Sequence, residues 1–352
     1  MVLKKTGLAA AVLLAGSQLA YANDLNINGF MTVGVGTSDK KVEVDGMTDG
    51  SNFTNDTILG LQVSKQLNSS TSATGQLVSR GTGSFETEAA WAYITYSADE
   101  NTDIRMGRLR TPFFYYSDFL EVGYAYNWTR PPGEIYSRLN PFSSVNGIDL
   151  TRRFSMGGAD AAVQVYYGNY DGNFDLPSIA GPLNTDITLE NLAGVVFSTS
   201  MGDFGTRISI HQADVTATIG GAAAPQIEDK KSEFYQAAVT YDNGDISALA
   251  EWTQLKHDTQ FLTDDMAYMV GVAKRIGETS VHLTYAVNED EPSSKLGQLD
   301  SQKYSSVILG MRYDYDSSTA LKLEAQHLTD KPADNAKEVS GMAYTLSVNV
   351  VF

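Results

Sequence analysis

The sequence contains no cysteine, and this absence narrows the chemistry open to the chain. Without thiols there is no disulfide framework, no metal–thiolate centre and no cysteine nucleophile. Histidine is scarce, with four residues, and the sequence has no G-x-S-x-G elbow, H-E-x-x-H helix or phosphate-binding glycine loop. We therefore expect no enzymatic activity, no catalytic residue, no metal site and no cofactor.

Basic residues are also fewer than acidic ones. The chain has 25 Lys and Arg against 42 Asp and Glu, for a formal net charge of −17. A nucleic-acid partner is excluded, because no basic surface is available to replace the counterions of the phosphates. The acidity has two compatible interpretations, namely solubility of exposed loops and a negative potential that attracts cations.

Long apolar runs are missing after the N-terminal region. No later segment reaches the 18 or so apolar residues that a membrane-spanning helix needs. The N-terminal region itself combines Lys4 and Lys5, the short apolar stretch Leu8–Leu14 and the small-x-small site Ala20–Ala22. This layout is typical of a secretory signal peptide. We expect residues 1–22 to be that peptide and residues 23–352 to form one exported domain.

What the chain does contain is alternation, most clearly at its C-terminal end, residues 341–352. One register is wholly apolar, and the other is small or polar until Val351. The apolar register consists of Met342, Tyr344, Leu346, Val348, Val350 and Phe352. Soluble strands are usually about 5 or 6 residues long, whereas a two-faced strand of about 9 to 11 residues suits a membrane β-barrel. The pattern therefore indicates the bacterial outer membrane.

The same pattern recurs along the whole chain, with no linker between repeats. We predict sixteen strands, at Leu25–Thr37, Thr57–Leu67, Ser72–Arg80, Glu88–Ser97, Thr102–Leu109, Ile148–Phe154, Asp160–Gly168, Leu189–Thr199, Thr206–Ala213, Glu233–Tyr241, Ile246–Gln254, Met266–Arg275, Thr279–Asn288, Tyr304–Tyr313, Thr319–Leu328 and Gly341–Phe352. Tight turns alternate with longer loops, and the polar stretches Tyr170–Ile187 and Asp214–Lys231 are expected to be loops, the second a mobile one.

An even number of strands with tight turns at one end predicts an all-β, antiparallel transmembrane barrel. Closure leaves no strand edge unpaired in lipid, and both termini lie at the periplasmic end. A barrel of this size encloses an aqueous lumen that side chains alone do not fill.

One stretch, residues 111–147, does not alternate. It holds four of the nine prolines, Pro112, Pro131, Pro132 and Pro141, and a dense set of aromatic residues. Surface loops are usually polar, so an aromatic loop should pack against something. The inside of the barrel is the simplest location.

With these features, the chain resembles the trimeric bacterial porins. The resemblance rests on the signal peptide, the strand pattern, the terminal Phe352 and the run Gly107–Phe114, which is similar to the G-R-x-x-x-P-F entry to the long third loop of many porins. The acidic P-E-F signature of many general porins is missing, and the second loop is short for a latch that reaches a neighbouring subunit.

In that family the third loop narrows the pore, and its acids face a ladder of basic residues on the wall. The resemblance implies Asp118, Glu121 and Glu134 as the acids of the constriction. Its basic residues would be Arg80, Arg105, Arg108, Arg110, Arg130 and Arg153. Alternation places Arg80, Arg105 and Arg153 on lumen faces, whereas it does not decide Arg108 and Arg110, at the entry to the loop, or Arg130, within it. The same charges could instead form salt bridges that pin the loop.

The function implied is passive diffusion of small hydrophilic solutes and ions through an outer-membrane homotrimer. Alternatives are a channel specific for one sugar, anion or amino acid, and a non-conducting adhesion barrel. Expected partners are outer-membrane lipid, lipopolysaccharide and the barrel assembly machinery, which in porin-like proteins reads a terminal aromatic such as Phe352.

Overall fold

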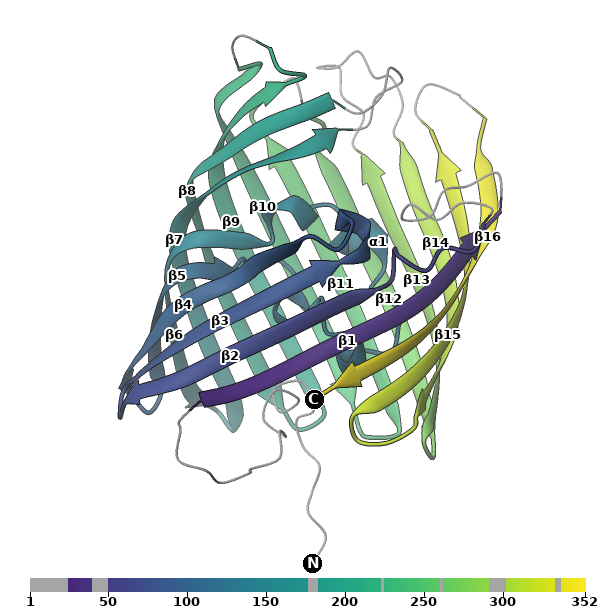
Figure 1. Cartoon of the computed structure of the whole chain (residues 1–352), viewed down its shortest axis with the longest axis horizontal. Coiled ribbons are helices and arrows are strands. Elements are labelled where there is room, and N and C mark those ends of the chain that lie inside the picture. The colour runs from purple at the N-terminus through teal and green to yellow at the C-terminus, as the bar shows by residue number, and fades with distance from the viewer. Residues whose placement is uncertain are drawn as a thin grey trace, which may run out of the picture.

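The computed structural model describes residues 25–39, 50–176, 183–222, 225–259, 262–290, 302–332 and 337–352. They form a closed barrel of sixteen antiparallel strands, in which each strand pairs with its neighbours in the chain and β1 pairs with β16 (Figure 1). The predicted fold class and strand count are confirmed. No helix among these residues is long and apolar enough to cross a membrane. The expected signal peptide, residues 1–22, lies outside the described residues.

The strands are β1 (Leu25–Ser38), β2 (Ile58–Asn68), β3 (Thr71–Arg80), β4 (Thr87–Asp99), β5 (Thr102–Arg110), β6 (Ser144–Met156), β7 (Ala159–Leu176), β8 (Leu183–Met201), β9 (Phe204–Ile219), β10 (Ile227–Asp242), β11 (Ile246–His257), β12 (Asp265–Ile276), β13 (Thr279–Asp290), β14 (Lys303–Asp314), β15 (Thr319–Lys331) and β16 (Val339–Val351). The helix α1 (Gly133–Tyr136) is short.

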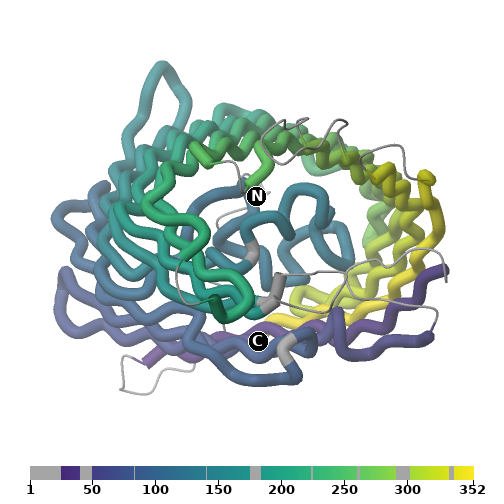
Figure 2. Tube along the Cα trace, turned by 90° about the horizontal axis from the view of Figure 1, so that it is seen from above, coloured from purple at the N-terminus to yellow at the C-terminus, as the bar shows by residue number. Residues whose placement is uncertain are grey.

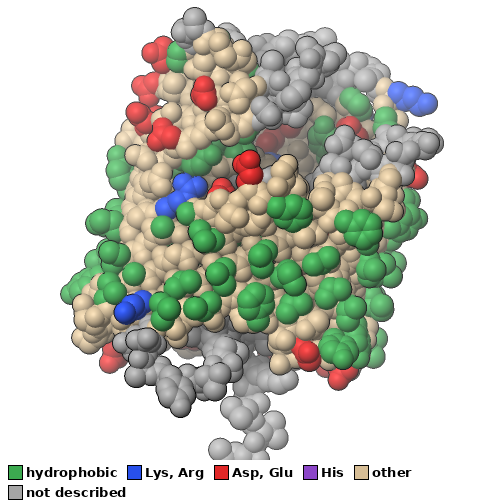
Figure 3. Space-filling model, viewed as in Figure 1, with side chains coloured by type: hydrophobic (Ala, Val, Ile, Leu, Met, Phe, Trp, Pro, Cys, Tyr) green, Lys and Arg blue, Asp and Glu red, His purple; other side chains and the backbone are tan. Residues whose placement is uncertain are grey.

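The alternation of the sequence becomes the two faces of the wall. In β16, Tyr344 and Leu346 are exposed on the outside, whereas Thr345 and Ser347 are buried on the inside. Figure 3 shows apolar side chains spread over the outer face of this side of the barrel. Successive side chains of a strand point to opposite faces, so one apolar register per strand produces a continuous apolar outer band.

The wall is uneven in height. Strands β7 to β10 have 16 to 19 residues, whereas β2, β3 and β5 have 9 to 11 (Figure 1). The expected loops at Tyr170–Ile187 and Asp214–Lys231 are therefore wrong over most of their length. The first is shortened because β7 runs on to Leu176 and β8 begins at Leu183, and the second because β9 runs on to Ile219 and β10 begins at Ile227.

The reason for this error is that the polarity of the strands reverses in the tall part of the wall. There the inward residues are apolar, as Leu189 and Val215 illustrate, and both are buried. The outward residues Glu190 and Asp214 are polar, and Glu190 is exposed whereas Asp214 is half-buried. A register shift between Glu190 and Ala193 separates the two patterns in β8. A bulge of this kind moves the following side chains to the opposite face.

The segment between β5 and β6, residues 111–143 and hereafter the inward loop, lies within the barrel (Figure 2). It contains α1 and three single turns of 3-10 helix. The prediction that it folds into the lumen is confirmed, but its end was placed too late, because Ser144–Gly147 already belong to β6. These residues pair with β5 through contacts such as Arg110↔Ser144.

Candidate functional site

The inward loop packs its aromatic side chains against one half of the barrel wall. Phe113 and Phe114 lie edge-on to Phe234 of β10, each with ring centroids 5.4 Å apart. Tyr126 and Trp128 continue the buried cluster, and burial raises the pKa of the Tyr126 phenol, which stays neutral. The aromatic composition of the loop is therefore explained by a dry contact with the wall.

Buried charged residues of the wall bind the backbone of the loop. Glu251 of β11 accepts a hydrogen bond from the Tyr115 backbone N–H at 2.8 Å and another from the Tyr136 hydroxyl. Arg207 of β9 donates to the carbonyl oxygens of Pro112 and Phe113. A buried charge is tolerated where such hydrogen bonds replace water.

Lys322 of β15 is the centre of a second anchor. Its ammonium donates to the carbonyl oxygens of Gly123 and Trp128, the latter at 2.5 Å, and lies 4.6 Å from the centroid of the Tyr126 ring. Glu324, on the same strand, accepts from the Thr129 hydroxyl and lies 3.4 Å from His282 Nε2. The loop is thus fixed to β9, β11 and β15 and occupies that half of the lumen.

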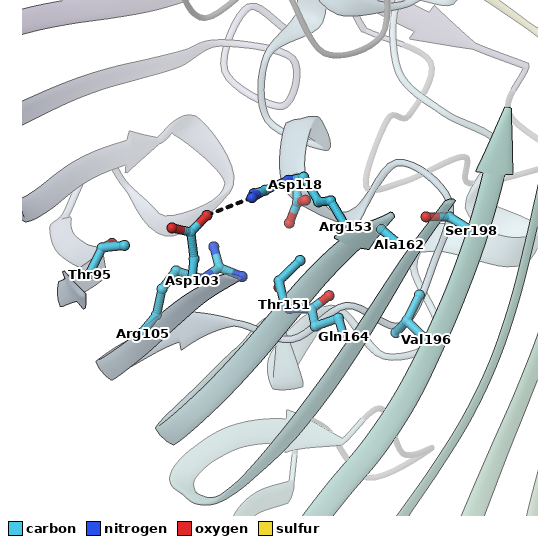
Figure 4. A pocket seen from close by; sticks show the side chains of 10 residues that line it. All are labelled: Thr95, Asp103, Arg105, Asp118, Thr151, Arg153, Ala162, Gln164, Val196 and Ser198. Atoms are coloured by element: carbon cyan, nitrogen blue, oxygen red, sulfur yellow. Dashed lines mark hydrogen bonds and ion pairs between the residues drawn. The ribbon is translucent and has the colours of Figure 1, made fainter. Parts of the chain in front are cut away.

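On the other side of the loop, a polar cavity of about 330 Å³ remains against β4 to β8 (Figure 4). We call it the Arg105 cavity, and its lining consists of Thr95, Asp103, Arg105, Asp118, Thr151, Arg153, Ala162, Gln164, Val196 and Ser198. Two arginines reach it from the wall, and Asp118 reaches it from the loop (Figure 4).

The charges of the Arg105 cavity are only partly balanced. Arg105 binds Asp149 through two hydrogen bonds, of 3.0 and 2.5 Å, and Arg153 binds Asp103 at 2.7 Å. Asp118 is exposed, and no side chain among the described residues forms an ion pair with it within 4.0 Å. Because each arginine already has a carboxylate partner, Asp118 leaves the cavity with an excess of negative charge.

The other acids proposed from the sequence lie elsewhere. Glu121 forms ion pairs with Arg80 and Arg110, the second at 3.5 Å, where the loop leaves β5. Arg110 also donates to the Ser117 carbonyl at 2.7 Å. Glu134 is buried on α1. Glu121 and Arg110 therefore hold the loop in place, and neither they nor Glu134 line the Arg105 cavity.

Two of the proposed arginines are also outside the cavity. Arg130 of the loop forms an ion pair with Asp56 at 2.5 Å, between β1 and β2. Arg108 lies beside Met106 and Ile148, whose side chains are exposed on the outer face of the barrel. Of the nine candidates, the structure brings together Asp118, Arg105 and Arg153.

Several important residues were not identified from the sequence. They are Asp103, Asp149, Arg207, Glu251, Lys322 and Glu324. The sequence does contain a feature that could have identified them. Each is a charged side chain in the inward register of a long strand, where the other residues are small and polar, and such a charge must contact water or the loop. Alternation assigns these side chains to the lumen, but it does not identify their partners. Asp103 and Asp149 pair with arginines of the wall, whereas the other four bind the inward loop, mostly at its backbone.

Comparisons with known proteins agree with this architecture. The family model described as Gram-negative porin matches residues 7–333. Among solved structures, the chain is similar to the outer membrane channel DcaP of Acinetobacter baumannii, with 11% identity, a TM-score of 0.64 and coverage of 96% of this chain and 100% of that one.

Two further structures are similar. The anion-selective porin from Comamonas acidovorans has 16% identity and a TM-score of 0.59, covering 93% of this chain and 99% of that one. The trimer form of in-vitro folded OmpT of Vibrio cholerae has 12% identity and a TM-score of 0.60, covering 94% and 100%. A search of curated proteins finds no significant match.

Proposed function

Since the chain belongs to the Gram-negative porin family, we propose that it forms a water-filled outer-membrane channel for passive diffusion of small hydrophilic solutes and ions. The observation that carries this proposal is the Arg105 cavity, which is polar and charged and lies between the inward loop and the wall. Such a lining replaces part of the hydration shell of a polar solute, whereas an apolar solute forms no hydrogen bonds with it.

The route runs along one side of the lumen. The loop is packed against β9, β11 and β15 through Arg207, Glu251 and Lys322, which leaves β4 to β8 as the solvent-facing wall. Asp118 on the loop and the paired arginines opposite it impose a field across the route. The excess negative charge supports a modest preference for cations.

No catalytic step or cofactor is part of this proposal. We further propose a homotrimer embedded in outer-membrane lipid and lipopolysaccharide, inserted by the barrel assembly machinery. The fold of the chain is similar to that of OmpT of Vibrio cholerae, whose structure includes a trimer form, and this similarity supports the homotrimer. The apolar outer band, on which residues such as Ile208 and Leu309 are exposed, supports the lipid contact.

Planar-bilayer recording of the purified full-length protein tests the proposal. We expect stepwise conductance increments that occur in threes and rise linearly with salt concentration. Current that saturates with one solute would instead favour a channel specific for that solute. A reconstituted barrel that does not conduct would refute transport and favour an adhesion barrel closed by the inward loop.

A further inference from the structure

Strands β5, β6 and β7 carry a polar row of residues on the outer face of the barrel. Arg108 pairs with Asn146 in β6, and Asn146 pairs with Asn169 in β7, so the three lie side by side. Arg108 is two residues from the end of β5, at Arg110, and therefore near the rim from which the inward loop departs. The row lies at the upper boundary of the apolar band on these strands.

The apolar band begins two positions below this row. Met106 pairs with Ile148, and Ile148 pairs with Tyr167, and all three side chains are exposed on the outer face. Aromatic residues with a polar tip are enriched at the level of lipid headgroups, and Tyr167 has this character. Headgroup and acyl-chain regions of a membrane would therefore meet between the two rows.

Between the polar and the apolar row lies a row of glycines. Gly107 pairs with Gly147, and Gly147 with Gly168. Gly107 has a φ of +136°, and a Cβ added at Gly147 would lie 2.2 Å from the Tyr167 carbonyl oxygen. An added Cβ at Gly107 would lie 2.2 Å from the Ala92 carbonyl oxygen of β4, so each of these backbones lies too close to a neighbouring strand for a side chain. At this place the wall has a hollow of about 840 Å³, hereafter the outer hollow.

The polar side of the outer hollow contains a chain of hydrogen-bonded side chains and the guanidinium group of Arg108. Tyr167 donates its hydroxyl to Asn191 at 2.8 Å, and Asn191 in turn donates to Asp214 at 2.7 Å. Nε of Arg108 is buried and has no hydrogen-bond partner among the described residues. Glu190 lines the hollow from β8. The remaining guanidinium nitrogens of Arg108 form no hydrogen bond or ion pair within the described part of the chain. In a chain of net charge −17, Arg108 therefore has donors left for an anion.

We propose that the outer hollow binds the headgroup of an outer-leaflet lipid that carries phosphate on a sugar. The planar guanidinium of Arg108 suits a phosphate, which it can bind through two parallel hydrogen bonds. The amides of Asn146 and Asn169 suit sugar hydroxyls, and the acyl chains lie over Met106 and Ile148. The proposal depends on the outer-membrane location of the barrel and not on its transport activity.

Native mass spectrometry of the full-length protein in detergent, titrated with diphosphorylated lipid A, tests this site. We expect Arg108→Gln to weaken binding about tenfold, because a neutral amide cannot replace the charged, paired hydrogen bonds of the guanidinium. Arg108→Lys should recover part of the loss. Glu190→Gln should strengthen binding, because it removes a carboxylate that repels the phosphate.

Arg152→Gln is the matched control. Arg152 lies on β6, near its opposite end, and binds Asp99 at 2.7 Å. Lipid A without phosphates should bind the wild type and Arg108→Gln alike, and soluble glucosamine phosphate should not compete, which separates a lipid from a free phosphate. Equal binding of lipid A to the wild type and Arg108→Gln, or equal losses in Arg108→Gln and Arg152→Gln, would overturn the proposal. We expect Arg108→Gln to leave the single-channel conductance unchanged, so that failure of the lipid proposal can be distinguished from failure of the transport proposal.

Discussion

Residues of the same type have different environments within the inward loop. Asp118, Glu121 and Glu134 are equivalent candidates in the sequence, yet Glu121 is held by two arginines and Glu134 is buried. A carboxylate that is paired with arginine contributes little net charge to the lumen. Ion selectivity should therefore depend mainly on Asp118, which is exposed beside the Arg105 cavity.

Replacing Asp118 with Asn tests this assignment. The substitution removes the uncompensated charge at nearly constant volume, so the cation-to-anion permeability ratio should fall on the order of threefold at low salt. Reversal potentials across a salt gradient measure the ratio. Asp203→Asn, in the turn between β8 and β9, is the matched control and should leave it unchanged. An unaltered reversal potential in Asp118→Asn would show that the ion route avoids this cavity.

Replacing Lys322 tests how the inward loop is fixed to the wall. Lys322→Met preserves the bulk of the side chain but leaves the carbonyl oxygens of Gly123 and Trp128 without their donor. We expect a loss of about 3 kcal/mol in the free energy of unfolding, because a buried charged network is broken on one side. Urea unfolding of the detergent-refolded protein measures it.

The control for Lys322 is Lys274→Met, since Lys274 is exposed and lies 3.6 Å from Asp245. An exposed pair of this kind contributes about 0 to 1 kcal/mol. Hydrogen exchange should also rise in the inward loop of Lys322→Met and not in Lys274→Met. If both variants lose equal stability and the loop stays protected, Lys322 is not the anchor.

At the scale of elements, the sequence predicted every strand, and its errors lie where the outer face is no longer apolar. Alternation with a period of two predicts a membrane strand when its apolar residues face outward and its polar residues face inward. In the upper part of β7, Tyr170 and Phe174 pack inward on Phe142 of the loop, with ring centroids 5.4 and 6.0 Å away. This phase, with apolar residues inside and polar residues outside, is that of a soluble sheet, and a search for the membrane pattern therefore predicts a loop here.

The position of the inward loop was predictable from composition, whereas its contacts were not. Aromatic residues in an expected loop indicate burial, and the only large enclosed space in a barrel is the lumen. Which side of the lumen it covers depends on Glu251 and Arg207, whose partners within the loop are mainly backbone groups. Backbone groups are identical in every residue, so no pattern of side chains reveals such pairs.

The row of glycines in β5, β6 and β7 gives a prediction about how closely these strands pack. Gly147→Ala places a Cβ 2.2 Å from the Tyr167 carbonyl oxygen and 2.7 Å from the Gly168 Cα, both backbone atoms that cannot move easily. We expect a loss of about 2 kcal/mol in unfolding free energy, as for an overpacked site. Gly75→Ala in β3 is the control, because nothing lies within 4 Å of its added Cβ. Equal stability of the two variants in urea would contradict the close approach of β6 and β7.

At the scale of the whole molecule, the barrel divides its interior into a closed and an open half. The closed half is filled by the inward loop and its buried charges, and the open half is lined by the Arg105 cavity. Of the tallest strands, β7 to β10, all four contribute to the closed half, and β7 and β8 also line the open half. The same loop therefore supports the wall from inside and defines the size and charge of the route. Loss of its anchors should change conductance and stability together.

Closure of the ring involves the last residue of the chain. The backbone of Phe352 exchanges hydrogen bonds of 2.6 and 2.9 Å with Gly29 of β1, and its ring covers the place where a Gly29 side chain would be. The ring is 60% exposed on the outer face. Phe352 is therefore placed to contact lipid at the seam, and we propose that it is also a signal for the assembly machinery.

Comparing Phe352→Ala with Tyr344→Ala separates these roles. Both rings belong to the outward register of β16 and are exposed to a similar degree. Each substitution should cost about 1 to 2 kcal/mol in protein refolded into lipid vesicles, because each removes one aromatic lipid contact. If Phe352 is also a signal, only Phe352→Ala should reduce the amount of heat-modifiable barrel in the outer membrane of expressing cells, by about tenfold or more, a loss larger than the stability cost alone implies. Equal amounts of both variants in the membrane would show that Phe352 acts only as a lipid contact at the closure of the barrel.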